Sequence, residues 1–132
     1  MQVTLVILKP SAIQRALLGE VISRFERKGL QIVGMKMLRL SDEILKEHYF
    51  HLVDKPFYGR VKDSMQATPV IVMALKGADA IDCVRKITGV TNGREAMPGT
   101  IRGDFCSSVQ ENIVHASRSE ERRVGKECRS RW

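Results

Sequence analysis

Apolar positions along this chain follow two periods, and the switches between them mark the expected strands and helices. Residues 3–8 form a β-branched, largely apolar run of strand length, which Pro10 ends because proline cannot donate to a strand ladder. From Ser11 onward, apolar side chains recur every three or four residues, which predicts a helix. We expect Gly29 to close this helix as a left-handed cap, and Gly19 is a candidate break within it.

A second strand is expected over residues 30–40, where the period returns to two. The phase of the apolar positions slips at Val33 and Gly34, which predicts a β-bulge. Met35 and Met37 lie in this strand. We expect them to pack in the core rather than to bind a ligand.

The middle of the chain predicts a helical hairpin followed by a strand and a helix. Ser41 can cap the first helix of the hairpin, and Pro56 is well placed to open the second. Residues 70–75 are apolar at every position, as in a central strand covered on both faces. Helical spacing returns over residues 79–87 and stops at Gly89.

Residues 89–111 show little periodicity and are rich in glycine and proline. A loop of that length inside a compact domain is usually functional or disordered. We interpret it as functional because it carries Thr91, Arg94 and Arg102 beside turn-forming residues. A short last strand is expected over residues 112–115.

The order strand, helix, strand, two helices, strand, helix, long loop, strand predicts an α+β fold. Specifically, it predicts a ferredoxin-like four-stranded antiparallel sheet with helices covering it. A length of 132 residues suits a single domain, since it is enough for one hydrophobic core and short for two.

Composition narrows the class of protein. The hydrophobic content of 43% is ordinary for a folded globular domain, and no apolar run approaches the length of a membrane span. Because the first strand begins almost at Met1, we expect no signal peptide. Three cysteines, Cys83, Cys106 and Cys128, are odd in number and lack metal-ligand spacing, so free thiols in the cytoplasm are expected.

The net charge of +7 is concentrated toward the C-terminus. Residues 118–132 carry six basic and three acidic side chains, so this segment supplies +3 of the total. The rest of the chain has no aromatic-interleaved basic stripe and no nucleic-acid motif, which argues against a nucleic-acid partner. A modestly basic body suits a binder of multiply charged nucleotides.

Two side chains near the end of the chain suggest phosphoryl chemistry. His115 ends the apolar run of the last strand, and Arg102 in its Gly-flanked turn offers a planar donor fork for phosphate oxygens. The chain has neither the GxxxxGK[ST] loop nor the HRD and DFG motifs, so phosphoryl transfer needs another route. A neutral imidazole nucleophile provides one. His48 and His51, within an expected helix, are interpreted as surface or packing residues.

Five motifs carry a family resemblance. KPSA at 9–12, HYFHLVDKPFY at 48–58, GVTN at 89–92, PGTIRGDF at 98–105 and NIVHAS at 112–117 resemble the nucleoside diphosphate kinases in order and spacing. The resemblance implies an enzyme that transfers the γ-phosphate of an NTP to an NDP by a ping-pong mechanism. It also implies that His115 is the catalytic nucleophile and forms a pros-phosphohistidine.

The resemblance also implies the nucleotide-binding residues. Lys9 and Arg102 would approach the transferred phosphate, and Arg85 and Thr91 the β-phosphate. Asn112 with Lys9 would contact the ribose hydroxyls, and Phe57 with Val61 would enclose the base. Tyr49 would lie close to His115, and Ser117, which matches the family pattern after the histidine, would be a supporting residue. Mg²⁺ is the implied cofactor, expected mostly on the nucleotide because no carboxylate cluster forms a cage. Asp104 is expected to have a structural role in its turn.

The C-terminal segment departs from the family pattern. We therefore assign residues 1–117 to the kinase domain and residues 118–132 to an atypical basic tail. Arg118 stands where the family has an aspartate, and Lys126 where it has the glutamate that orients the imidazole. An alternative is thus a nucleotide-binding regulatory relative with weak turnover. A third interpretation is a nucleic-acid binder that acts through the tail.

Family members are homo-oligomers, hexamers or tetramers built from dimers that pair sheet edges. Residues 3–8 and residues 30–40 are the two candidate edges.

Overall fold

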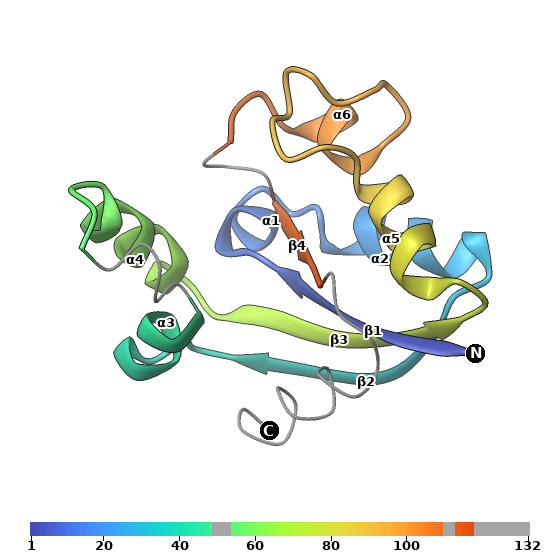
Figure 1. The fold of residues 1–132 in the computed structure, drawn as a ribbon, viewed down its shortest axis with the longest axis horizontal. Helices are drawn as coiled ribbons and strands as arrows, with labels where there is room; N and C mark the ends of the chain where they lie inside the picture. Colours follow the sequence, from blue (N-terminus) through green and yellow to red (C-terminus); the bar gives the residue numbers. More distant parts are fainter. Residues whose placement is uncertain (49–53, 110–112, 118–132) are drawn as a thin grey trace.

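The computed structural model describes residues 1–48, 54–109 and 113–117. In chain order its elements are β1 (Gln2–Leu8), α1 (Pro10–Gln14), α2 (Leu18–Lys28), β2 (Gln31–Leu38), α3 (Asp42–His48), α4 (Tyr58–Gln66), β3 (Val70–Gly77), α5 (Ala80–Thr88), α6 (Ile101–Phe105) and β4 (Val114–Ala116). The strands pair antiparallel in the order β2-β3-β1-β4 (Figure 1). The expected ferredoxin-like sheet is therefore confirmed.

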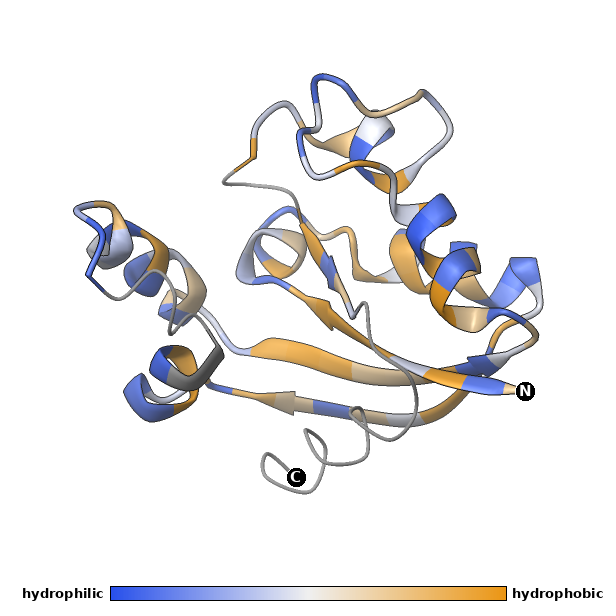
Figure 2. Ribbon diagram, in the orientation of Figure 1, coloured by the Kyte–Doolittle hydropathy of each residue, from blue (hydrophilic) through white to orange (hydrophobic). Residues whose placement is uncertain are grey.

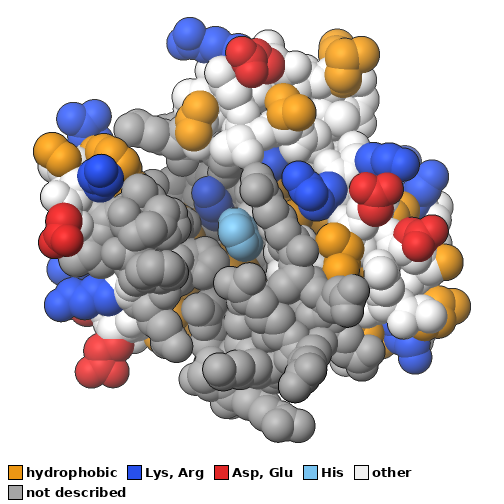
Figure 3. Space-filling model, in the orientation of Figure 1, with side chains coloured by type: hydrophobic (Ala, Val, Ile, Leu, Met, Phe, Trp, Pro, Cys, Tyr) orange, Lys and Arg blue, Asp and Glu red, His pale blue; other side chains and the backbone are white. Residues whose placement is uncertain are grey.

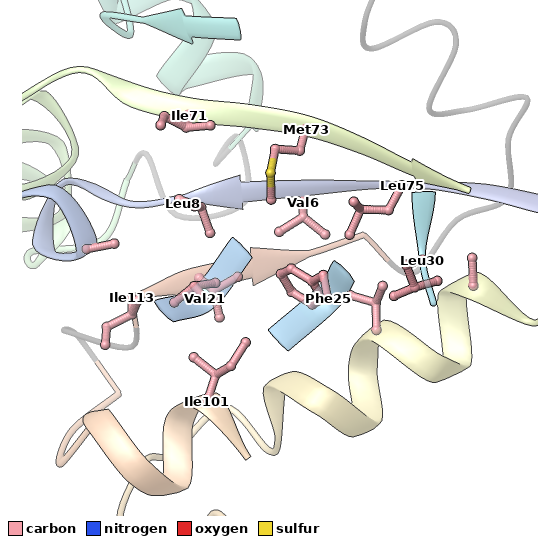
Figure 4. Close-up of a cluster of buried hydrophobic side chains, with 14 of the residues drawn as sticks. Val6, Leu8, Val21, Phe25, Leu30, Ile71, Met73, Leu75, Ile101 and Ile113 are labelled. Carbon is pink, nitrogen blue, oxygen red and sulfur yellow. The ribbon is translucent and has the colours of Figure 1, made fainter. Parts of the chain in front are cut away.

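Two hydrophobic clusters lie on opposite faces of the sheet, because neighbouring residues of a strand point to opposite faces. The first joins Val6 and Leu8 of β1 to Val21 and Phe25 of α2 (Figure 4). The second takes the alternate strand positions and packs against α3 and α4; its buried members are Leu5, Ile7, Leu40, Leu45, Met65, Val70 and Val72. Figure 2 shows the apolar character concentrated in β1, β3 and the sheet-facing sides of the helices.

Several local predictions are confirmed. Gly29 closes α2 with a φ of 101°, a left-handed conformation that favours glycine. The Ser41 hydroxyl oxygen accepts a hydrogen bond from the Ile44 backbone N–H at 3.2 Å, which caps α3. The register of β2 against β3 shifts between Ile32 and Gly34, where the bulge was expected.

The break in the first helical region was placed wrongly. Helix α1 ends at Gln14 and α2 begins at Leu18, so Gly19 lies inside α2 rather than at the division. Ala16, between the two helices, has a φ of 56° and turns the chain there. An isolated glycine in a helical pattern lowers helix propensity but does not by itself end a helix.

The prediction that Met35 and Met37 pack in the core is wrong. Their side chains are 45% and 57% exposed, respectively. Their register partners on β3, Met73 and Ile71, are buried. The difference arises because β2 is an edge strand, so the same face of the sheet is covered over β3 and open over β2.

Helix α6 was not expected, since residues 101–105 fall in the segment interpreted as a loop. The Thr100 hydroxyl caps it by accepting from the Gly103 N–H at 2.9 Å and donating to the Met97 carbonyl oxygen at 2.7 Å. A β-carbon at Gly103 would lie 2.0 Å from the Met97 carbonyl oxygen. Residue 103 must therefore be glycine for the turn to close against the helix.

Neither Cys83 nor Cys106 forms a disulfide, as expected, and Cys128 lies outside the described residues. Within the ranges that the model describes, no helix is both long and apolar enough to cross a bilayer.

Candidate functional site

His115 lies on the edge strand β4, directly opposite Ile7 of β1. Paired residues of neighbouring strands point to the same face of a sheet. The half-buried imidazole therefore shares its face with Ile7, whereas Val114 points into the core on the other face. The side chain belongs to the rigid sheet but remains within reach of solvent. Figure 3 shows a histidine near the middle of one face of the molecule, with Lys or Arg side chains on either side.

Lys9 follows β1 directly and is joined to the backbone beside His115. Its N–H donates to the Ile113 carbonyl oxygen at 2.7 Å, which extends the pairing of β1 and β4 by one step. Lys9 keeps an extended backbone, with a φ of −73° and a ψ of 165°, before α1 begins at Pro10. Strand alternation then brings its side chain out on the face that carries Ile7 and His115.

Burial and, to a lesser extent, the positive charge of Arg102 lower the pKa of the Lys9 ammonium to about 8, while Cys106 acts in the opposite direction. The lowered pKa means that, without a bound anion, the ammonium of Lys9 is poorly stabilised by its buried surroundings and by the nearby Arg102. An anion bound there would provide that stabilisation.

Arg102 connects three elements around the histidine strand. It projects from α6, and only 8% of it is exposed. Its Nη1 donates to the Gly89 carbonyl oxygen at 2.8 Å, and its Nη2 donates to the Val114 carbonyl oxygen at 2.6 Å. The guanidinium thus lies between the end of α5 and the residue that precedes His115.

Ile113, two residues before His115, has a strained backbone. Its φ of 67° is an outlier for a β-branched residue, and its side chain is fully buried. Its carbonyl oxygen accepts the hydrogen bond from Lys9. Such strain persists only where the surrounding contacts enforce it, and it is concentrated at functional sites.

Arg85 and Thr91 lie on either side of the Gly89 turn that Arg102 contacts. Arg85 is in the last turn of α5 with an exposed side chain, and its carbonyl oxygen accepts the Gly89 N–H at 3.0 Å. Thr91 is exposed two residues beyond that glycine. Arg94 holds the loop to the segment after α6, since its Nε donates to the Ser107 carbonyl oxygen at 2.8 Å. The side chains of Arg85 and Thr91 are therefore open to solvent on either side of Gly89, the residue whose carbonyl oxygen Arg102 contacts.

Phe57 and Val61 lie on a different element, at the start of α4. Phe57 is the N-cap residue of α4 and is 42% exposed, and Val61 is one helical turn further along and half-buried. Helix α4 contacts α1, the helix that follows Lys9. In Figure 1, β4 lies between the α4 region on one side and the α5 and α6 regions on the other.

Of the three remaining expected residues, Ser117 lies in the described part of the chain. The Ser117 N–H donates to the Leu5 carbonyl oxygen at 2.9 Å, and the residue is 7% exposed, so it continues the pairing of β4 with β1. Tyr49 and Asn112 lie outside the described residues, as do residues 118–132.

The structure thus brings Lys9 and Arg102 to the strand that carries His115, and it places Arg85 and Thr91 on either side of Gly89, whose carbonyl oxygen Arg102 contacts. Within the described part of the chain, no group of three or more histidine, cysteine, aspartate or glutamate side chains is arranged to hold a metal ion. A separate surface hollow between α2 and α5 has a mixed-charge lining, and none of the expected site residues lines it.

Sequence reasoning missed the arginines that hold α6 from outside the site. Arg24 of α2 forms an ion pair with Asp104 at 2.7 Å, and Nη1 of Arg15 donates to the Phe105 carbonyl oxygen at 2.5 Å. The only sequence signal for Arg24 was its spacing of four residues from Glu20, which is common on exposed helix faces.

Comparison with known proteins gives a consistent result. The family model described as nucleoside diphosphate kinase matches residues 2–128. A nucleoside diphosphate kinase of Parabacteroides distasonis is 62% identical over 121 residues, which cover 92% of this chain and 79% of that protein.

Two solved structures have the same fold as this chain. A halophilic nucleoside diphosphate kinase from Halobacterium salinarum in complex with CDP superposes with a TM-score of 0.83 at 41% identity, over 87% of this chain and 76% of that one. A family protein from Babesia bovis superposes with a TM-score of 0.89 at 37% identity, over 100% of this chain and 88% of that one.

Proposed function

Because the chain belongs to the nucleoside diphosphate kinase family, whose members transfer phosphate between nucleotides, we propose that His115 carries the phosphate. The observation that supports this proposal is the position of the imidazole. It lies on a rigid strand, on the face where Lys9 emerges, next to the backbone carbonyl that Arg102 contacts. A fixed nucleophile beside two cations suits attack on a phosphoryl group.

The exchange takes place in two steps. An imidazole nitrogen of neutral His115, Nδ1 in the pros form, attacks the γ-phosphorus of an NTP, and the bond to the bridging oxygen breaks to release NDP. A second NDP then attacks the phosphohistidine through its β-phosphate oxygen, which restores the imidazole and yields the new NTP. Lys9 and Arg102 stabilise the charge on the equatorial oxygens in both steps.

The other expected residues bind the rest of the nucleotide. Arg85 and Thr91, beside the Gly89 turn, contact the β-phosphate, and Asn112 with Lys9 contacts the ribose hydroxyls. Phe57 and Val61 enclose the base, and the exposed ring of Phe57 supplies a stacking surface. Since every base has a π-face, this mode of binding accepts many nucleotides.

Mg²⁺ is the proposed cofactor. The side chains gathered here are two cations and an imidazole, which suit phosphate oxygens, so the phosphates of the nucleotide would provide the ligands of the ion. When bound, the ion neutralises phosphate charge. Within that arrangement Lys9 and Arg102 bind and orient the transferred group.

We also propose a cytoplasmic homo-oligomer, a hexamer or a tetramer of dimers. Of the two candidate edges, residues 3–8 pair with β3 along their whole length and with β4 at Val6–Leu8, whereas β2 pairs on one side only among the described residues. Val33, Met35 and Met37 leave that edge apolar and exposed, at 48%, 45% and 57%, respectively. An exposed apolar edge strand is suited to pairing with a second copy.

The test is labelling of the full chain with γ-labelled ATP and Mg²⁺. We expect a label that is acid-labile and alkali-stable, that is discharged by added GDP or CDP, and that is absent from His115→Ala. His48→Ala is the matched control and should label normally. Full exchange activity in His115→Ala would refute the mechanism. Nucleotide binding without labelling in the unmodified chain would favour the regulatory alternative.

A further inference from the structure

Arg24 of α2 contacts three groups on or just before α6, at Gly99, Asp104 and Phe105, and a fourth group, Glu20, on its own helix. Its Nη2 pairs with Asp104 Oδ2 at 2.7 Å, and its Nη1 donates to the Gly99 carbonyl oxygen at 3.2 Å. Its Nε donates to Glu20 Oε1 at 3.1 Å, and the guanidinium lies 4.9 Å from the centroid of the Phe105 ring. Only 19% of the side chain is exposed, so the guanidinium is enclosed by these contacts.

Asp104 and Arg24 bind each other and both contact the backbone of Gly99. The Oδ1 of Asp104 accepts from the Gly99 N–H at 2.9 Å while its other oxygen binds the guanidinium. The hydrogen bond from Gly99, followed by that from Arg24, lowers the pKa of the Asp104 carboxyl group. The pair therefore contacts both backbone groups of Gly99, which joins α2, the turn before α6 and α6 itself. This is more than the local turn role expected for Asp104.

Helix α6 depends on such contacts because it has only five residues. A single helical turn is not stable by itself and takes its position from the surrounding structure. On the inner side, Arg102 contacts the Gly89 and Val114 carbonyl oxygens. On the outer side, Arg24 contacts Asp104, two residues further along the same helix.

The outer contacts decide how much of Arg102 is available to a substrate. If Arg24 did not hold α6, the position of the helix would depend more heavily on the bonds that Arg102 makes to the two carbonyls. Turning the guanidinium toward a phosphate would then also loosen α6. With Arg24 in place, the backbone of residue 102 stays fixed while its side chain engages the phosphate, which is the preorganisation that phosphoryl transfer requires.

We propose that Arg24 is a positioning residue for phosphoryl transfer, acting through Asp104 and α6 on Arg102. This inference rests on the proposed function, because Arg102 must contact the transferred phosphate for its placement to matter. Arg24 itself touches no substrate.

The test is a double-mutant cycle on the full chain, read out as the single-turnover rate at which γ-labelled ATP phosphorylates His115. Arg24→Met keeps the length of the side chain and removes its donor fork. We expect it to slow labelling roughly tenfold to hundredfold, the range that a displacement of about 1 Å can cause. Arg24→Lys, which keeps the charge but loses the fork, should be intermediate. Arg27→Met, an exposed position on the same helix, should label normally.

The decisive comparison is Arg24→Met combined with Arg102→Ala. If Arg24 acts through Arg102, the double variant should be no slower than Arg102→Ala alone, although its melting temperature should fall further. A purely structural role predicts that the two rate effects multiply, and that outcome, or a normal rate in Arg24→Met, would overturn the inference.

Two further results separate the inference from the proposed function. A normal rate in Arg102→Ala would remove the role of Arg102 and with it the role of Arg24, while loss of the label in His115→Ala would still support the phosphohistidine. Asp104→Asn removes the ion pair from the other side, so it serves if Arg24→Met fails to fold. It should show the same lack of additivity with Arg102→Ala.

Discussion

Arg102 donates from Nη2 to the carbonyl oxygen of Val114 at 2.6 Å, and Val114 immediately precedes His115 on β4. The proposed nucleophile and the proposed phosphate-binding cation are thus held to each other through one backbone carbonyl. Any movement of α6 is transmitted to the neighbourhood of the histidine, which is why contacts remote from the nucleotide can matter to the reaction.

Arg102→Ala should reduce transfer strongly and lower stability. Loss of a preorganised charge at the transferred phosphate removes about 3 to 4 kcal/mol of transition-state stabilisation, or roughly 10² to 10³ in rate. The carbonyl oxygens of Gly89 and Val114 would also lose their donors. Steady-state kinetics with ATP and GDP, together with the melting temperature, would measure both effects. A fall in stability without a fall in kcat would contradict the phosphate role.

The pKa of Lys9, lowered to about 8, predicts a pH dependence of activity. As pH rises through 8, the free enzyme loses the ammonium that binds phosphate, so kcat/KM should decline on the alkaline side. Lys9→Arg keeps its charge over the same range and should remove that decline, even if its absolute rate is lower. An identical alkaline limb in both proteins would assign the titration to another group.

The same pKa predicts a pH dependence of stability. The folded pKa is about 8 and the ordinary pKa of a lysine is 10.5, so between these values the unfolded chain binds more protons and stability should rise with pH. Below pH 8 the cost of the buried charge is present in full, and Lys9→Met should be more stable than the unmodified chain by up to about 3 kcal/mol. That advantage should shrink as pH approaches 10.5, which urea unfolding at several pH values would reveal.

Phe57→Ala should weaken binding of all nucleotides by a similar factor. The ring is exposed at the start of α4, and stacking of a base on an aromatic ring contributes about 1 to 3 kcal/mol whichever base is present. Calorimetric titration of the variant with ADP, GDP, CDP and UDP would measure the change. A loss confined to one base would show that recognition uses hydrogen bonds instead.

Thr4→Val should stabilise the protein. Thr4 is fully buried in β1, and its hydroxyl oxygen has no hydrogen-bond partner among the described residues. Valine has the same branched shape without the unsatisfied polar group, so the free energy of unfolding should rise by about 1 kcal/mol. Thermal unfolding would test this, and Thr4→Ser, which keeps the hydroxyl and loses a methyl group, should be less stable than the parent.

Much of the fold was predictable because strand alternation and helical spacing record which side of each element is buried. The fully apolar residues 70–75 indicated a central strand, and β3 has that position. The motif around His115 and the lysine at the end of β1 were likewise readable, since each is a local feature of the chain. The exposure of Met35 and Met37 was not predictable, because it depends on β2 being an edge, a property of the assembled sheet.

The sequence by itself determined the strands, most of the helices, the family and the identity of the candidate nucleophile, all of which depend on local pattern or on motif order. Only the tertiary structure decided that residues 101–105 form a helix, that Arg102 contacts the carbonyl next to His115, and that Arg24 holds α6 through Asp104. The physical reason is that a five-residue helix and a long-range ion pair have no periodicity. Their stability comes from contacts with elements far away in the chain, which no local stretch of sequence records.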